Sequence, residues 1–180
     1  MNILAITSSP RPYSNSRTLL REIERGIKDK GEHNLVSLDV AKMNIAPCRA
    51  CEACRGKAGS ECVIKDDMIK VAEEFRKADY IFMATPIYWW DVCAQLKLVI
   101  DRLYCIDNSE WPGKTFHLVI TGQTETSNVG YYVIKNAFAG MCEWLKVDLK
   151  AFCVSAYDET HIVTENKQAL ADAYELGLSL

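Results

Sequence analysis

The sequence lacks long apolar stretches and any excess of positive charge, and these absences exclude several classes of protein. None of its apolar runs approaches the roughly 20 residues that a membrane-spanning helix needs. The formal net charge is -3, so there is no basic stripe to follow a phosphate backbone, and neither nucleic acid nor an anionic membrane is an expected partner. Low-complexity tracts and internal repeats are also missing, which excludes a disordered or solenoid chain.

A targeting signal is not apparent either. The first apolar run, Met1–Thr7, has no positively charged segment before it and no small-residue cleavage site after it, so we expect a cytoplasmic protein. In a reducing compartment, the eight cysteines are more often metal ligands, redox groups or core residues than disulfides. The three histidines are dispersed, and no arrangement for hydrolytic acid–base catalysis is present.

Strand and helix patterns alternate along the whole chain, as expected for a single domain over residues 1–180. The expected strands are residues 2–7, 33–40, 80–84, 115–121 and 149–155. The expected helices are residues 16–30, 66–77, 91–104, 130–145 and 164–176. With right-handed crossovers, this alternation predicts a three-layer α/β/α fold, in which a doubly wound parallel sheet of five strands has the flavodoxin-like order 2-1-3-4-5. A cysteine-bearing insertion, residues 44–65, follows the second strand.

Ligands bind such sheets beyond the carboxyl ends of the strands, so the loops after the first, third and fourth strands are the expected site. The first loop is rich in hydroxyl groups, carries one guanidinium and leads into a helix. Amides at a helix N-terminus together with these side chains suit a mononucleotide phosphate, and the loop has neither a dinucleotide fingerprint nor a nucleoside-triphosphate P-loop. The candidate residues are Ser9, Arg11, Ser14, Asn15 and Ser16. The alternative interpretation is that residues 14–16 only cap the helix.

The loop after the third strand contains three adjacent aromatic residues, Tyr88, Trp89 and Trp90. Their number favours contact with a flat ring such as an isoalloxazine, and Pro86 fixes the backbone beside it. The candidate residues here are Pro86, Ile87, Tyr88 and Trp89. The alternative is that the aromatics cover a sheet edge or a subunit contact. After the fourth strand, Thr121, Gly122 and Gln123 are the candidates, and Gly122 would permit close backbone approach to a ring.

Cys48, Cys51, Cys54 and Cys62 form the pattern C-x2-C-x2-C-x7-C within the insertion. Three thiolates spaced two residues apart, with a fourth beyond a loop, favour a 4Fe-4S cluster over structural zinc, which is usually bound by two separated cysteine pairs. The alternative is that the cysteines remain without a cluster. Cys93 and the three cysteines in later apolar stretches are expected to be core residues.

Several of these motifs together resemble the NADPH-dependent FMN reductase and iron-sulfur flavoprotein family. They are Ser-Pro-Arg at 9–11, Ser-Asn-Ser at 14–16, Thr-Pro-Ile-Tyr-Trp at 85–89, Ala-Gln-Leu-Lys at 94–97, Asp-Arg at 101–102, and the cysteine motif followed by Asp-Asp-Met at 66–68. The resemblance implies that the first loop holds the FMN phosphate and that the loop after the fourth strand reaches the pyrimidine side of the flavin. It also implies a 4Fe-4S cluster on the four cysteines and a homodimer or homotetramer with the flavin near the subunit interface.

Two kinds of function follow from that resemblance. The first is an oxidoreductase that takes electrons from NAD(P)H through FMN to a quinone, a free flavin or another small molecule. The second is a carrier that passes electrons through FMN and the cluster between ferredoxin-like proteins. A zinc-binding structural module is a third alternative, but it leaves the first and second loops unexplained.

Overall fold

The computed structural model describes residues 1–55, 61–156 and 162–180, so part of the cysteine insertion and His161 lie outside the described residues. The strands are β1 (Asn2–Thr7), β2 (Asn34–Asp39), β3 (Tyr80–Tyr88), β4 (Asp91–Val92), β5 (Thr115–Gly122) and β6 (Asp148–Ser155). The α-helices are α1 (Asn15–Lys30), α2 (Met68–Lys77), α3 (Ala94–Arg102), α4 (Val129–Leu145) and α5 (Lys167–Leu178). Short 3-10 helices are η1 (Val40–Lys42), η2 (Leu103–Cys105), η3 (Asn108–Glu110) and η4 (Val163–Glu165).

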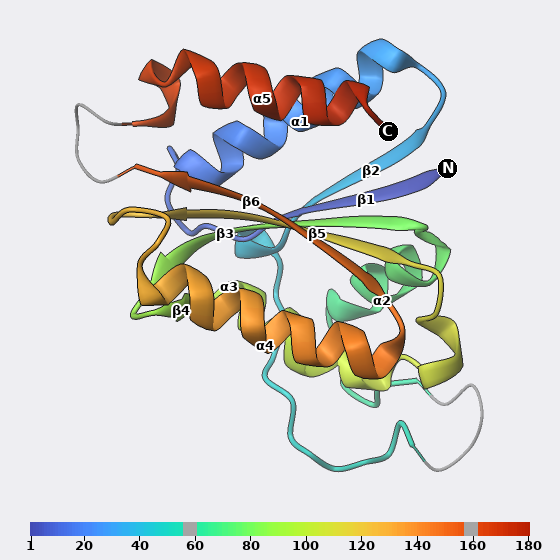
Figure 1. Cartoon of the computed structure of the whole chain (residues 1–180). Coiled ribbons are helices and arrows are strands. Elements are labelled where there is room, and N and C mark those ends of the chain that lie inside the picture. The colour runs from blue at the N-terminus through green and yellow to red at the C-terminus, as the bar shows by residue number, and fades with distance from the viewer. Residues whose placement is uncertain (56–60, 157–161) are drawn as a thin grey trace.

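The main sheet is parallel and has the order β2-β1-β3-β5-β6 (Figure 1). The short strand β4 pairs only with the end of β3 and runs antiparallel to it. Without β4, this is the predicted order 2-1-3-4-5, and the predicted fold class is confirmed. From β1 the chain adds β2 on one side, and from β3 onward it adds strands on the other side. In sheets of this kind a ligand binds at the crevice where the order switches, here between β1 and β3.

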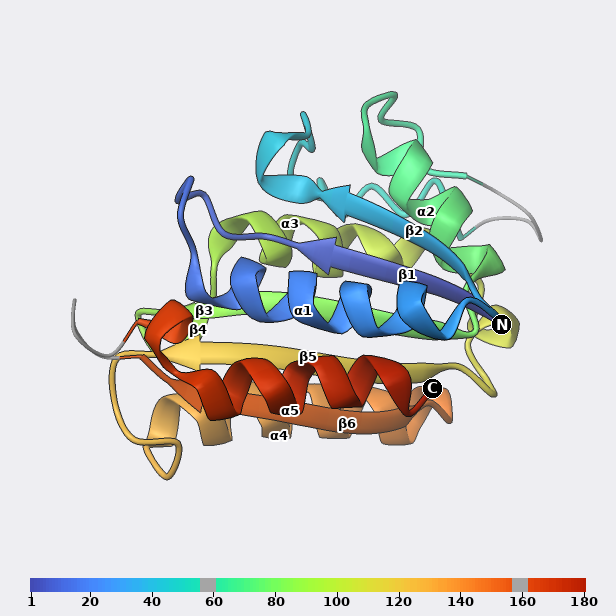
Figure 2. The same ribbon diagram turned by 90° about the horizontal axis from the view of Figure 1, so that it is seen from above.

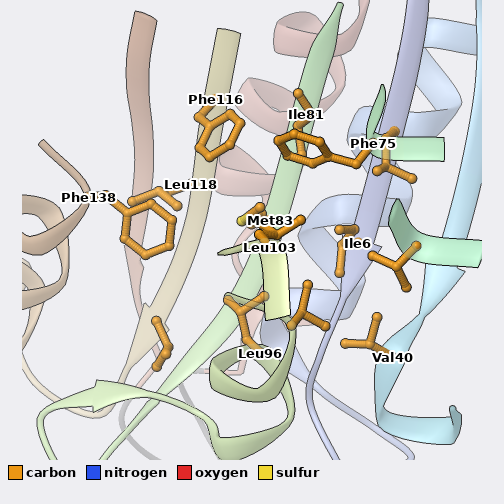
Figure 3. Packing of buried hydrophobic residues seen from close by; sticks show 14 of the residues in the cluster. Ile6, Val40, Phe75, Ile81, Met83, Leu96, Leu103, Phe116, Leu118 and Phe138 are labelled. Atoms are coloured by element: carbon orange, nitrogen blue, oxygen red, sulfur yellow. The ribbon is translucent and has the colours of Figure 1, made fainter. Parts of the chain in front are cut away.

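Helices cover both faces of the sheet, as expected when parallel strands are apolar on both sides. In Figures 1 and 2, α1 and α5 lie together on one face, and α3 and α4 lie on the other. Side chains such as Ile6, Met83 and Leu118 point from the sheet toward Leu96 of α3 and Phe138 of α4 (Figure 3). The opposite core contains Ile3, Ala5 and Phe82 of the sheet packed against α1 and α5.

Two glycines allow α1 and α5 to approach very closely. A Cβ atom at Gly26 would overlap the backbone oxygen of Tyr174, and one at Gly177 would overlap the backbone oxygen of Ile23. Backbone therefore packs on backbone at this crossing. Because α1 begins at the loop after β1, the C-terminal helix supports the element that presents that loop.

The third strand differs most from the sequence-based expectation. A loop was expected at residues 85–90 and a helix from 91, but β3 continues to Tyr88 and forms a hairpin with β4, which delays α3 to Ala94. Trp89 and Trp90 are the two central residues of the turn, with φ angles of 50° and 64°. Positive φ at both positions is the pattern of a type I′ turn, for which Asn-Gly is the usual sequence, so two tryptophans gave no hairpin signal.

The remaining helix boundaries shift by a few residues. Helix α2 begins at Met68 instead of residue 66, because Asp66 and Asp67 bind backbone amides at the base of the cysteine insertion. Helix α5 begins at Lys167 after the 3-10 turn η4. Among the described residues, no helix combines the length and apolarity that crossing a bilayer would require.

Candidate functional site

A cavity of about 500 Å³ opens at the carboxyl ends of β1, β3, β5 and β6. This volume falls in the range of small-molecule and cofactor sites. Ten of the twelve residues predicted to bind the cofactor line it: Ser9, Arg11, Ser14, Asn15, Pro86, Ile87, Tyr88, Thr121, Gly122 and Gln123. Three arginines, Arg11, Arg17 and Arg21, are also on its wall, and no carboxylate is among its described lining residues. The described part of the cavity wall is therefore electropositive.

Arg17, in the first turn of α1, organises the loop after β1. Its guanidinium donates to the backbone oxygens of Arg11 and Pro12, both at 3.2 Å, and to that of Ser9 at 2.9 Å. It also pairs with Asp39 at the end of β2, with an N–O distance of 3.1 Å. These contacts turn three carbonyl dipoles, which would repel an anion, toward the arginine. Arg17 Nε is buried and has no hydrogen-bond partner among the described residues.

The N-terminus of α1 completes this electropositive wall. Ser14 is the N-cap and its hydroxyl accepts from the amide of Arg17 at 3.5 Å, so the capping interpretation holds for this residue while it also lines the cavity. Asn15 accepts from the amide of Val163 through Oδ1 and so connects α1 to η4. Ser16 is buried outside the cavity lining, with its hydroxyl 3.1 Å from that of Ser14.

The hairpin β3–β4 forms the opposite wall. Ile87 and Tyr88 are half-buried and line the cavity, and Arg11 lies 5.9 Å from the centre of the Tyr88 ring. Trp89 does not line the cavity, because the turn directs its side chain into solvent, where it is 90% exposed. The hairpin thus presents one aromatic ring to the cavity and another to the surroundings.

A buried junction joins the hairpin to the loop after β1. Cys93, the N-cap of α3, is fully buried, and its thiol donates to the backbone oxygen of Ser8 at 3.2 Å. The amide of Cys93 donates to the Thr85 hydroxyl at 3.2 Å, and the Ser8 hydroxyl donates to the backbone oxygen of Ala84 at 2.7 Å. The two loops that form the cavity walls are therefore held in a fixed relation.

The third predicted loop contributes a wall whose packing explains Gly122. A Cβ atom at this position would lie 2.9 Å from both Ile87 Cδ1 and Tyr131 Oη. The Tyr131 hydroxyl donates to the backbone oxygen of Val154 at 2.9 Å, so it cannot retreat without losing that bond. The glycine thus makes room for the protein's own side chains. Sequence reasoning missed the remaining lining residues on this side: Ala156, Ile162 and Thr164.

The described parts of the cysteine insertion, residues 44–55 and 61–65 (the cysteine segment), lie on the face of the sheet covered by α2 and α3 (Figure 1), and none of their residues lines this cavity. Cys48 and Cys51 are exposed, whereas Cys54 and Cys62 are half-buried against the core. Ala50 and Glu52, between the first three cysteines, have positive φ angles of 50° and 54°. In residues 1–55, 61–156 and 162–180, no three potential ligands come together in a metal-binding group. The four cysteines that a 4Fe-4S cluster needs are all present in the sequence. In the described residues, however, their thiols are not gathered around one point.

Two aspartates and one arginine close the base of this segment. Asp67 accepts from the amide of Asn44 at 2.7 Å, and Asp66 accepts from the amide of Ala46 at 2.8 Å. Arg102, at the end of α3, forms a two-pronged ion pair with Asp66 at 2.9 and 3.1 Å. Burial favours the protonated carboxyl, but the bonds from Arg102 and from the amides of Ala46 and Met68 outweigh it and lower the pKa of Asp66. Sequence reasoning missed the roles of Arg17 and Arg102, since a buried arginine has no local pattern.

The fold and the cavity together define a flavodoxin-like α/β protein with an electropositive pocket large enough for a mononucleotide. The sequence profile of the NADPH-dependent FMN reductase family matches residues 1–159, and the chain belongs to that family. The family resemblance found in the sequence is thereby confirmed.

Curated relatives include iron-sulfur flavoproteins of archaea. The chain is 36% identical over 103 residues to one from Methanocaldococcus jannaschii, a match that covers 57% of this chain and 51% of that protein. It is also 36% identical over 102 residues to one from Methanosarcina thermophila, covering 57% of this chain and 52% of that protein. The chain thus matches about half the length of these relatives.

Solved structures share the fold at low sequence identity. An NAD(P)H:quinone oxidoreductase from Methanothermobacter marburgensis superposes with a TM-score of 0.80 at 17% identity, covering 99% of this chain and 95% of the other. An FMN-dependent NADH-azoreductase from Bacillus anthracis, solved in complex with FMN, gives a TM-score of 0.74 at 13% identity and covers 98% of both chains.

Proposed function

We propose that this chain binds FMN in the cavity at the carboxyl ends of its strands and acts as an NAD(P)H-dependent oxidoreductase toward a quinone, a flavin or a similar acceptor. The observation that carries the proposal is the polarity of the cavity. Arginines and a helix N-terminus form one wall, while Ile87 and Tyr88 form the other. The buried Nε of Arg17, which lacks a partner among the described residues, also suits an anionic ligand.

Each wall has a distinct task in this proposal. Ser9, Arg11, Ser14 and Asn15 bind the phosphate, with Ser16 supporting Ser14 from within the helix. Pro86, Ile87 and Tyr88 lie along the ring system, and Thr121, Gly122 and Gln123 border its pyrimidine edge. Trp89 contacts the flavin or the acceptor only from outside the cavity. Bound FMN would accept a hydride from NAD(P)H and pass the electrons on, while the protein orients it and excludes water.

Substitution of Arg11 tests the phosphate assignment. Arg11→Ala is expected to weaken FMN binding by about 1.5–3 kcal/mol, the usual contribution of a hydrogen bond to a charged group. Fluorescence titration of the apoprotein with FMN measures this change. Arg25→Ala, which removes an arginine of the following helix α1 that lies outside the cavity, is the matched control. Equal FMN affinity of the Arg11 variant and wild type would contradict the assignment.

We further propose that Cys48, Cys51, Cys54 and Cys62 hold a 4Fe-4S cluster, which would exchange single electrons with a protein partner. The spacing of the thiols supports this, as do the names of the curated relatives. Metal analysis and a visible spectrum of anaerobically purified protein test it. Iron with a broad brown absorbance is expected; flavin bands alone would favour a cluster-free reductase, and zinc in a colourless protein would refute both proposals.

We also infer self-association as a homodimer or homotetramer. Trp89 and Tyr13, beside the cavity, are 90% and 96% exposed, and large aromatic side chains in such positions commonly lie at interfaces. Light scattering of the FMN-loaded protein is expected to give at least twice the chain mass of 20.3 kDa. A monomer at micromolar concentration would contradict this inference.

A further inference from the structure

Arg102 occupies an unusual position between the core and the cysteine segment. Its side chain is 1% exposed, although it carries a full charge. Besides the ion pair with Asp66, it donates to the backbone oxygen of Ala46 at 2.9 Å and to that of Ile64 at 3.4 Å. Ala46 precedes Cys48 by two residues, and Ile64 follows Cys62 by two. One guanidinium therefore binds the chain on both sides of the four-cysteine motif.

The hydrogen bonds of Arg102 leave one donor unused. A guanidinium has five N–H groups, and the four on the two terminal nitrogens have the acceptors described above. The remaining donor, Nε–H, is buried and has no partner among the described residues. A buried donor without a partner costs free energy, so an acceptor that reaches this N–H would stabilise the site.

The surroundings of Arg102 contain a suitable acceptor. The arginine lines a small cavity together with Cys62 and Cys105, between α2 and the end of α3. Cys62 is the last cysteine of the motif and is half-buried there. A sulfur ligand of a cluster accepts hydrogen bonds, so a buried N–H that faces the same cavity as Cys62 is a chemically suitable donor.

We propose, building on the cluster assignment above, that Arg102 positions Cys62 as the fourth ligand. In the cluster-bearing protein its guanidinium keeps the two ends of the segment together and donates its free Nε–H to the Cys62 sulfur. Hydrogen bonds to ligand sulfurs raise the reduction potential of an iron-sulfur cluster, and residues that orient ligands raise metal affinity. Arg102 therefore holds the cluster more tightly and makes it easier to reduce.

The decisive variant is Arg102→Lys, which keeps the charge but lacks Nε–H and the planar fork. Its matched control is Arg76→Lys, because Arg76 lines the same cavity yet pairs with Glu110 instead of the cysteine segment. Full-length chains are reconstituted anaerobically with iron and sulfide in the presence of FMN. Three quantities are compared: iron per chain, the rate of iron loss to a chelator, and the cluster potential from a spectroscopically monitored redox titration.

For Arg102→Lys we expect iron loss about tenfold faster than in wild type, the lower end for loss of a ligand-orienting residue, and a more negative potential. Arg76→Lys is expected to match wild type in the rate of iron loss and in the cluster potential. If wild type takes up iron, and Arg102→Lys has the same cluster potential and the same rate of iron loss as wild type, the role of Arg102 is refuted while the cluster assignment is retained. If wild type takes up no iron, the cluster assignment is refuted, and the inference with it.

A second measurement covers the case in which Arg102→Lys fails to fold. Asp66→Asn loosens the same contacts at nearly constant volume and leaves Arg102 in place. We expect iodoacetamide to alkylate Cys62 faster in this variant than in wild type, when both proteins are free of cluster and loaded with FMN. Mass spectrometry counts the adducts, and the buried Cys142 is the internal reference. Equal alkylation rates at Cys62 would overturn the proposal that these contacts position it.

Discussion

A buried histidine in the sheet makes the stability of this protein depend on pH. His117 of β5 and Tyr80 of β3 are each 5% exposed, and the Tyr80 hydroxyl lies 3.0 Å from His117 Nδ1. Phe82 stacks on the imidazole at 5.2 Å. Burial, with a smaller effect of Lys150, lowers the pKa of His117 to about 4, and burial raises the pKa of Tyr80 to about 12. At neutral pH the ring is therefore uncharged and the hydroxyl keeps its proton.

The size of the effect follows from the difference between folded and unfolded pKa. A histidine in the unfolded chain titrates near pH 6.5, so below that pH the unfolded state binds a proton that the folded state does not. The free energy of unfolding then falls as the pH falls. For His117 the loss is about 2 kcal/mol between about pH 7.5 and about pH 5, and about 3 kcal/mol at about pH 4.

Urea unfolding of FMN-free protein at these pH values tests this reasoning, with His117→Gln for comparison. The glutamine amide can accept the Tyr80 hydroxyl but does not titrate. Other titrating groups contribute equally to both proteins, so their effects cancel in the difference. We expect the variant to lose about 2 kcal/mol less than wild type between about pH 7.5 and about pH 5. If both proteins lose stability in parallel, the buried histidine is not the cause.

Two further substitutions test the backbone features described above. Replacing Trp89 with Asn and Trp90 with Gly is expected to raise the free energy of unfolding, measured in urea, by about 1–2 kcal/mol, because Asn and Gly adopt positive φ at lower cost than Trp. An unchanged or lower free energy of unfolding would contradict the conclusion that this turn is strained. Gly177→Ala is expected to lower it by about 3 kcal/mol or more, since its Cβ would overlap the backbone of Ile23 and no side chain can move aside. Gly140→Ala, where a Cβ meets nothing within 4 Å, is the control and is expected to be neutral or stabilising.

The layers, the strand order and most of the cavity residues could be predicted from sequence because they depend on local patterns. Apolar strands alternating with amphipathic helices determine the doubly wound sheet, and that topology brings the loops after Thr7, Ala84 and Thr121 to one end. The roles of these loop residues in FMN binding stay predictions. Their proximity required only the fold and no knowledge of side-chain contacts.

The parts that sequence reasoning missed depend on contacts between distant residues. Arg17 and Arg102 look like ordinary polar helix positions, and only the folded chain shows that each binds backbone carbonyls and a carboxylate from another element. The hairpin after β3 was missed because a turn with positive φ at two tryptophans contradicts local preference. The sequence suggests that Gly122 lets a ring approach the backbone, and only the structure shows that Ile87 and Tyr131 lie where its Cβ would be.

Helix α3 connects the position of the cavity to the position of the cysteine segment. Its N-cap, Cys93, is bonded to the loop that borders the cavity, and its last residue, Arg102, is bonded to the cysteine segment. An α-helix advances about 1.5 Å and turns about 100° for each residue. Inserting or deleting a single residue between them would rotate the Arg102 side chain away from Asp66 by about 100°, so the length of α3 sets where the cysteine segment is held relative to the cavity.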